Sequence, residues 1–367
     1  MSRSGWLRFF SAAVALGLLA LGGCSDERRT LRLYTWYEYF APGVITAFEQ
    51  RHDCHVEIIS YRSNEEMLDR LRTEGAGFCD LIIPSSFCVL QMLREGLIVP
   101  IDHAKCPSVR RNFDGAYAYT VPEDPELRFA VPYAVCQAGF FCATNCIPRG
   151  LDIDTWTVLG DPAVKGRISL LDEMRHVLGA ALISLGYSVN SENEQEVEAA
   201  TDRVLAWARN ARLWTCDDYK FEVMAGNIWI GQGYGAVVQT IIAGGEDHPA
   251  SEKLTFVYPR EGFIRTSDEL AVSSGCRDAD LAHAFLEFLY SDPDAGRMSI
   301  EYLGAMMPIL PAVAALDDGA RKRILLPPET AARASILRGF DGKPEVQALY
   351  DRAWRRIVES RKTVTAE

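Results

Sequence analysis

Short apolar runs that alternate with helical stretches constrain the fold of this chain more than any other feature. Residues 31–36 and 55–61 have the β-branched and aromatic content of strands, and residues 80–84 form the continuous apolar run of a strand buried in a parallel sheet. Between them, Pro42 opens one helix and Gly75 ends another. The order β-α-β-α-β predicts a doubly wound α/β domain with helices on both faces of its sheet.

The rest of the chain repeats this pattern with new elements. We expect strands at 167–171, 227–231, 254–257 and 269–272, and helices at 175–185, 191–212, 234–243, 278–290, 294–302, 319–325, 329–337 and 344–359. A chain of 367 residues is long enough for two domains with separate cores. No internal repeat or Pro-rich linker divides them, so we expect two lobes that interleave along the chain.

Aromatic, hydroxyl and acidic side chains gather where the expected strands begin and end, at 35–39, 84–87, 172–176 and 266–268. Ligands of open α/β sheets bind outside the carboxyl ends of the strands. An aromatic face attracts a cation by about 0.5–2 kcal/mol, and a buried ammonium group needs an acidic partner. The pattern favours a ligand that carries positive charge on an apolar stem. The alternative is that Trp36 and Tyr39 are core residues and that Asp172 or Asp268 caps a helix or turn. It explains each residue by itself, but it does not explain why such residues occur at all four places.

Several segments match one family in detail. They are TWYEY at 35–39, YRSNEEM at 61–67, DLIIPS at 80–85, REGLI at 94–98, VPY at 131–133, KGRI at 165–168, LGYS at 185–188 and the run 261–268. From about residue 31 to 313 the chain resembles the periplasmic spermidine/putrescine-binding proteins that deliver polyamines to ABC importers. The resemblance implies a two-lobed periplasmic-binding-protein fold of type II. Its first lobe would be residues 30–136 with 268–308, and its second lobe residues 137–267 with 309–367.

The resemblance also implies a set of ligand-binding residues. Trp36 and Tyr39 would provide aromatic walls, and Ser85 a hydrogen bond. Phe87 would keep an aromatic face but lacks the hydroxyl of a tyrosine. Two carboxylates, Glu173 and Asp268, would hold the two ends of a putrescine- or spermidine-type cation.

Other positions depart from the family pattern. His176 stands where a second carboxylate is usual, and Gln232 and Thr266 stand where aromatic residues are usual. Two more aromatic positions of the family are Val135 and Ala305 here. We therefore expect a roomier and more polar site, to which His176 and Gln232 contribute, and a ligand that is either a polyamine or another small organic cation. The residues that could replace the missing aromatic walls are Tyr234 and Trp229.

The first 24 residues have the form of an export signal. Arg3 and Arg8 precede an apolar stretch at 9–20, and Leu-Gly-Gly leads directly into Cys24. This stretch is shorter than the ~20 residues of a membrane-spanning helix, and it resembles the bacterial lipobox, whose cysteine is lipidated after cleavage. Residues 1–23 would then be a signal peptide and 24–29 a lipidated linker. The alternative is an uncleaved anchor helix. Under both interpretations the globular part lies outside the cytoplasmic membrane and is tethered to it, so we expect a periplasmic, lipid-anchored protein.

Charge and motif content disfavour other function classes. The net charge of −12 argues against nucleic acid, which is bound through clustered Lys and Arg. The chain has no G-x-S-x-G, H-E-x-x-H or C-x-x-C motif, so we expect no catalytic residues, metal site or cofactor. The nine cysteines other than Cys24 are an odd number, and buried thiols are the favoured interpretation. We expect a monomer that works with the permease and ATPase of an ABC importer. A sensor or receptor lipoprotein is the alternative.

Overall fold

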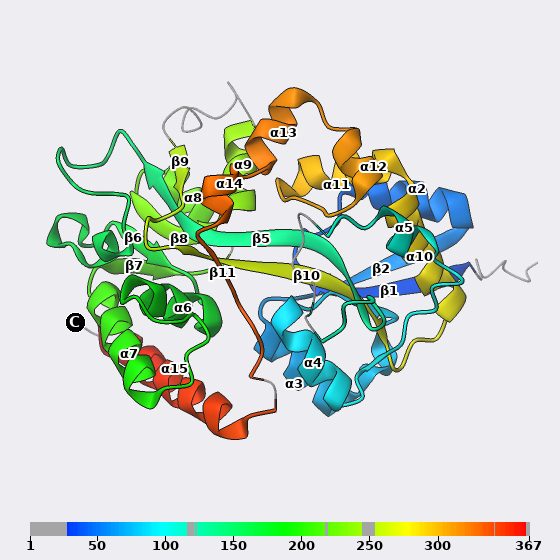
Figure 1. Cartoon of the computed structure of the whole chain (residues 1–367), viewed down its shortest axis with the longest axis horizontal. Helices are drawn as coiled ribbons and strands as arrows, with labels where there is room; N and C mark the ends of the chain where they lie inside the picture. The colour runs from blue at the N-terminus through cyan, green and yellow to red at the C-terminus, as the bar shows by residue number, and fades with distance from the viewer. Residues whose placement is uncertain are drawn as a thin grey trace, which may run out of the picture.

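Two long antiparallel strands, β5 (Ala130–Ala143) and β10 (Phe263–Ser273), run through the middle of the molecule and join two α/β lobes (Figure 1). The structure is a computed structural model that describes residues 28–115, 121, 123–216, 219–243, 254–340 and 342–364. Strand pairing continues across the junction in the order β2-β1-β3-β10-β5-β8-β6-β7. The two-lobed α/β fold predicted from the sequence is therefore confirmed. The predicted leader and Cys24 lie outside the described residues.

The first lobe is a parallel sheet with helices on both faces. Its elements are β1 (Arg29–Trp36), α2 (Pro42–His52), β2 (Cys54–Tyr61), α3 (Asn64–Glu74), β3 (Leu81–Ile82), α4 (Ser86–Arg94) and β4 (Ile98–Val99). Strand β1 pairs with β2 and β3 in parallel. Because strand side chains alternate between faces, Leu31 and Leu33 pack in one core with Phe48 of α2, and Tyr34 packs in another with Leu71 of α3.

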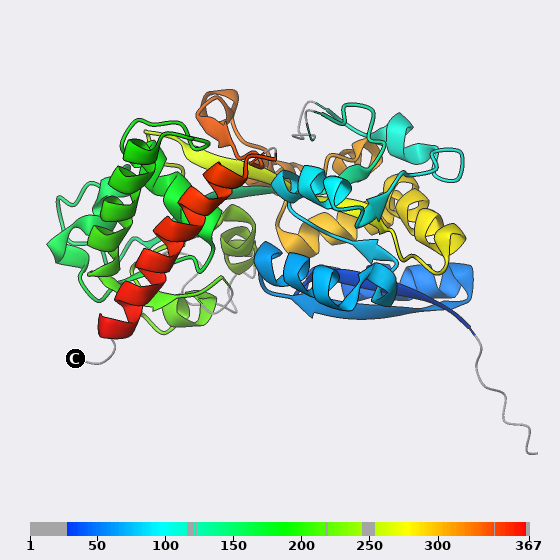
Figure 2. The same cartoon turned by 90° about the horizontal axis from the view of Figure 1, so that it is seen from below.

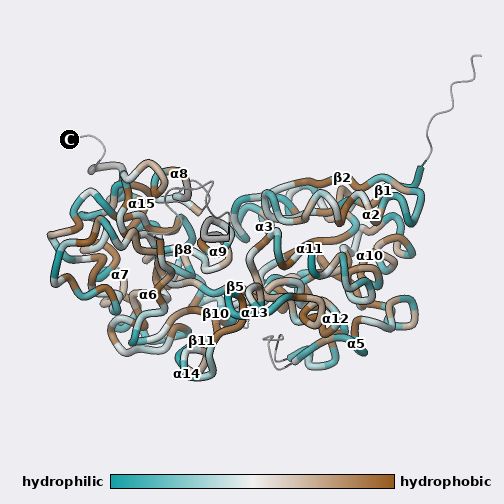
Figure 3. The backbone as a smooth tube through the Cα atoms, turned by 90° about the horizontal axis from the view of Figure 1, so that it is seen from above, coloured by the Kyte–Doolittle hydropathy of each residue, from teal (hydrophilic) through white to brown (hydrophobic). Residues whose placement is uncertain are grey.

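The second lobe has the same architecture around a different core. Its elements are β6 (Ile168–Leu170), α6 (Met174–Ser184), α7 (Glu194–Ala208), β7 (Ala211–Trp214), α8 (Tyr219–Met224), β8 (Ile230–Tyr234), α9 (Gly235–Ala243) and β9 (Leu254–Val257). Strand β6 pairs in parallel with both β7 and β8. The fully buried Trp156 and Trp207 stack in its core. Figure 2 shows the two lobes side by side, and Figure 3 shows hydrophobic segments within each of them.

The remaining elements cover the ends and outer faces of the lobes. They are α5 (Ser108–Asn112), α10 (Ala279–Ser291), α11 (Pro293–Leu303), α12 (Leu310–Ala314), α13 (Asp318–Ile324), α14 (Pro328–Ala331), β11 (Ala334–Ile336), α15 (Pro344–Val364) and the short 3₁₀ helices η1 (Ala76–Phe78), η2 (Trp156–Gly160) and η3 (Pro162–Val164). The helix predicted at residues 329–337 is wrong. Only α14 is helical there, and β11 pairs with β10 in parallel. A sheet edge with unpaired backbone groups can outweigh the helical propensity of the segment.

The segment that follows residue 308 packs against both lobes. We predicted that all of residues 309–367 belong to the second lobe. Ile309, Ala312 and Ile324 instead pack in the core of the first lobe, whereas Leu337 and Tyr350 pack in the core of the second. This packing favours a division between Ile324 and Leu337 in place of the predicted one at residue 308, because each half buries its apolar face in a different core.

All nine cysteines of the described residues are free thiols, and five of them are buried. Within the same residues, no helix is both long and apolar enough to cross a membrane.

Candidate functional site

A β-bulge points Asp268 into the junction between the lobes. Along β10 the pairing with β5 shifts between Asp268, which faces Ala134, and Glu269, which faces Pro132. Proline has no N–H for the ladder, and bulges of this kind redirect side chains. Asp268 also forms an isolated bridge with Ser85, the residue before α4. The bulge therefore brings a carboxylate from β10 to the carboxyl end of β3.

The Asp268 carboxylate accepts hydrogen bonds from three side chains of three different segments. One oxygen accepts from Ser85 Oγ at 2.9 Å, and the other accepts from Tyr39 Oη at 2.5 Å and from Cys136 Sγ at 3.2 Å. Burial raises the pKa of Asp268, while these three donors act in the opposite direction. A carboxylate has about four lone-pair sites, so the arrangement leaves one for a further donor.

The donors to Asp268 are themselves held in place. Asn64 at the start of α3 donates to Ser85 Oγ at 3.2 Å and accepts from Ser85 N at 3.2 Å, which leaves the Ser85 hydroxyl hydrogen for Asp268. Burial raises the pKa of the Cys136 thiol well above its usual value, so Cys136 stays a donor. Sequence analysis missed both Asn64 and Cys136. Asn64 lies in the matched run 61–67, which was the available signal, and Cys136 had none beyond its position in the strand between the lobes.

A second acidic group lies at the first turn of α6. Glu173 caps this helix by accepting from the backbone N–H of His176 at 2.7 Å and of Arg175 at 3.4 Å. Nδ1 of His176 also bonds the same carboxylate. Burial alone would raise the pKa of Glu173, but the charge and hydrogen bonds of His176 outweigh it and lower that pKa. Most of the hydrogen-bonding capacity of Glu173 is therefore used within its own helix.

His176 has one ring nitrogen in use and one free. The side chain is buried, and its Nε2 atom has no hydrogen-bond partner among the described residues. The ring lies edge-on to Tyr234 of the second lobe, with centroids 5.3 Å apart, and to Phe87 of the first lobe, 6.4 Å away. His176 is thus enclosed by aromatic faces from both lobes.

The aromatic residues predicted to line the site have different surroundings. Trp36 packs on Tyr61 at the end of β1, with ring centroids 4.6 Å apart. Tyr234 lies beside His176, whereas Trp229 lies under the Arg167 guanidinium at 5.1 Å, before the start of β8. A role for Tyr234 as a replacement aromatic wall stays a prediction.

Gln232 contacts backbone at the start of α6. Its amide accepts from Leu171 N at 3.4 Å and donates to His176 O at 3.0 Å, and the side chain is fully buried. Both ends of the amide are occupied, so this geometry fits a residue that positions α6. Its role as a ligand contact stays a prediction.

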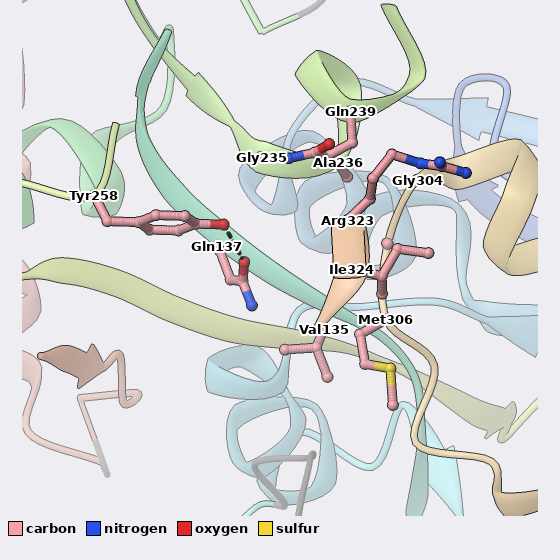
Figure 4. A pocket seen from close by; sticks show the side chains of 11 residues that line it. Val135, Gln137, Gly235, Ala236, Gln239, Tyr258, Gly304, Met306, Arg323 and Ile324 are labelled. Atoms are coloured by element: carbon pink, nitrogen blue, oxygen red, sulfur yellow. Dashed lines mark hydrogen bonds between the residues drawn. The ribbon is translucent and has the colours of Figure 1, made fainter. Parts of the chain in front are cut away.

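A small hollow of about 10 Å³, which is the space of about one water molecule, lies beside the strands that join the lobes (Figure 4). Val135 and Ala305, two positions where the family usually has aromatic residues, both line it. Gln137 and Tyr258 are joined across it by a hydrogen bond of 2.7 Å. Val135 and Ala305 both pack in the core of the first lobe, so little open space is left where the two rings are missing.

Glu65 is an acidic residue near the site that sequence analysis did not single out. It follows Asn64 in the first turn of α3, and its side chain is open to solvent. Partial desolvation at the junction and, next, the charge of Glu173 raise its pKa. Glu65 from the first lobe and Glu173 from the second therefore repel each other across the junction. No group of three or more His, Cys, Asp or Glu residues in the described chain is arranged to hold a metal ion.

Comparisons with known proteins agree with this architecture. The family model for bacterial extracellular solute-binding proteins matches residues 43–327. The spermidine/putrescine-binding periplasmic protein of Escherichia coli (strain K12) is 29% identical over 368 residues, which cover 99% of this chain and 97% of the relative. Two solved structures match most of this chain and nearly all of their own length. The TpPotD lipoprotein of Treponema pallidum matches with a TM-score of 0.77 at 28% identity, over 89% of this chain and 99% of that one. The spermidine/putrescine ABC transporter substrate-binding protein PotD of Streptococcus pneumoniae matches with a TM-score of 0.73 at 26% identity, over 91% and 99%. This chain belongs to the bacterial extracellular solute-binding protein family.

Proposed function

We propose that this protein is the substrate-binding subunit of an ABC importer and takes a polyamine-type cation between its two lobes. The observation that carries the proposal is the Asp268 carboxylate, buried at the junction and held by donors from β5, from the residue before α4 and from the loop after β1. The names of the Escherichia coli and Streptococcus pneumoniae proteins, which refer to spermidine and putrescine, support the same ligand class.

The physical basis of binding is the desolvation of an ammonium group. A buried ammonium needs a charge-assisted hydrogen bond, which contributes roughly 1.5–3 kcal/mol. Asp268 has an unused lone-pair site, and the ring of Tyr39 beside it packs at an angle of 55° to the ring of Tyr133, with centroids 5.6 Å apart. One ligand ammonium would donate to Asp268, and the apolar stem would lie along the aromatic rings.

The partners and the anchor follow from the same proposal. An importer subunit delivers its ligand to a permease coupled to an ATPase. Cys24, in the lipobox-like leader, would carry the lipid that tethers the protein to the membrane on its periplasmic side. One of the similar solved structures is itself described as a lipoprotein, which supports this part of the proposal.

Titration of Asp268→Asn with putrescine tests the proposed site. The substitution nearly preserves shape and removes the charge, so we expect binding to weaken about tenfold to a hundredfold. Asp280→Asn is the matched control, because Asp280 is exposed and its carboxylate pairs with Lys105 at 2.5 Å. Thermal melting of both variants establishes that they fold. Equal affinity of Asp268→Asn and wild type would contradict the assignment.

A further inference from the structure

The last turn of α15 contacts the loop that leads from β6 into α6. Arg361 on this helix pairs with Asp172 at 2.6 Å, although the two residues are 189 positions apart in the sequence. Asp172 directly precedes Glu173, whose side chain caps α6. Helix α15 lies beside α7 (Figure 1), so the C-terminal helix joins the second lobe to the segment that carries one of the two predicted ligand carboxylates.

Two tryptophans fix the Arg361 guanidinium. It lies over the ring of Trp214 at 3.6 Å and over the ring of Trp354 at 4.6 Å, and the side chain is only 17% exposed. Trp214 ends β7, which pairs in parallel with β6, the strand that leads to Asp172. An ion pair between two mobile surface side chains contributes little. Stacking orders the planar guanidinium before it meets the carboxylate, so this pair constrains the loop more effectively than a fully exposed pair would.

A second contact holds the other side of Glu173. Arg175 follows two residues later and is buried. Its guanidinium lies over the ring of Phe340 at 4.3 Å and over the ring of Tyr350 at 5.1 Å. Phe340 precedes α15 and Tyr350 lies on it. The C-terminal segment 340–361 therefore contacts charged residues on both sides of Glu173.

We propose that Arg361 is a positioning residue for the ligand site. Through Asp172, and not by contact with the ligand, it fixes the position of the Glu173 carboxylate at the junction between the lobes. The C-terminal helix thereby takes part in ligand selection. This inference rests on the proposed function, since Glu173 is the second carboxylate of the proposed site.

Asp172→Asn and Arg361→Gln break the ion pair from its two sides. A positioning role predicts that each variant binds putrescine about threefold to tenfold more weakly than wild type, and that the double variant binds no more weakly than either. A purely electrostatic effect predicts a different pattern, because one variant removes a negative charge and the other removes a positive charge. Their affinities for a cation would then move in opposite directions, and added salt would reduce the difference.

The preference for putrescine over 1-aminobutane separates positioning from general destabilisation. 1-Aminobutane has a single ammonium group, which Asp268 would hold, so its affinity should change little in either variant while that of putrescine falls. Arg356→Gln is the matched control, because Arg356 lies on the same helix and pairs with Glu198 and Asp202 of α7, each at 2.7 Å. This control should bind both amines like wild type.

The outcomes distinguish this inference from the proposed function. If wild type binds no diamine, the proposed function fails and the inference fails with it. If wild type binds putrescine but both variants bind it equally well, or their affinities move in opposite directions, only the inference is overturned. An equal loss of affinity for putrescine and 1-aminobutane also overturns the inference.

Hydrogen exchange followed by mass spectrometry gives a readout that needs no ligand. The backbone N–H groups of Arg175 and His176 donate to the Glu173 carboxylate, so they report on its position. Peptides that cover residues 172–177 should exchange faster in Asp172→Asn than in wild type, while peptides from the first lobe stay unchanged. The Asp172 side chain is 52% exposed, so this variant should fold even if Arg361→Gln does not. Unchanged exchange over residues 172–177 would overturn the inference.

Discussion

Glu269→Gln should stabilise the protein at neutral and alkaline pH. Glu269 follows Asp268 at the bulge, and its side chain is 1% exposed. It accepts a hydrogen bond from Ser267 Oγ at 2.6 Å. Burial is the main reason that its pKa rises to about 8, and the charges of Asp268 and Asp124 add to the effect, while the Ser267 hydroxyl opposes it. The folded protein therefore holds a proton on Glu269 that the unfolded chain has released near neutral pH.

The magnitude follows from the difference between the folded and ordinary pKa values, about 8 and 4.5. Each pKa unit corresponds to about 1.36 kcal/mol. Because the folded pKa is raised, the contribution to stability is fully present below pH 4.5 and is lost as pH rises toward 8. The loss is about 3 kcal/mol at pH 7 and approaches about 5 kcal/mol above pH 8. Glutamine keeps the acceptor for Ser267 and has no charge, so it avoids this loss.

Thermal melting of both proteins from pH 5 to 9 measures the effect. Glu269→Gln should match wild type near pH 5 and melt progressively higher than wild type as pH rises. Glu329→Gln removes a charge from an exposed glutamate and serves as the control. Parallel curves of melting temperature against pH for wild type and Glu269→Gln would refute this prediction. They would mean that the pKa of Glu269 does not change on folding.

Three further changes test the leader, the packing and the site. Cys24→Ala should release the protein to the soluble fraction and abolish labelling by a palmitate analogue, and unchanged labelling would contradict the lipobox interpretation. Gly231→Ala should destabilise the fold by about 1–3 kcal/mol, since the new Cβ would lie 2.0 Å from the Phe141 ring. Gly77→Ala, with open space around it, should melt like wild type. Tyr39→Phe removes a donor to Asp268 and should weaken putrescine binding about tenfold in calorimetry, and an unchanged affinity would exclude Tyr39 from the site.

The residues around Asp268 were singled out because we expected them next to strand ends. Tyr39 and Ser85 do follow strands, whereas Asp268 lies at a bulge inside β10, and the structure brings all three together by hydrogen bonds. Glu173 and His176 contact each other because they lie at the first turn of one helix, and their role toward a ligand stays a prediction.

The parts that could not be predicted depend on contacts between distant segments. Cys136 reaches Asp268 only because β5 and β10 pair across 132 positions of sequence. The occupied amide of Gln232 depends on how β8 meets α6, which no local pattern reports. The same holds for β11, whose residues carry a helical pattern but complete the edge of β10.

The claim that this site binds a polyamine-type cation is tested most directly by titration calorimetry of the wild-type protein at pH 8 with putrescine, cadaverine and spermidine. We expect saturable one-to-one binding of at least one of them. The melting temperature should also rise with ligand concentration, with a stabilisation of about 2.7 kcal/mol at one hundred times the dissociation constant. The absence of both heat and a shift in melting temperature with every polyamine up to millimolar concentration would contradict it.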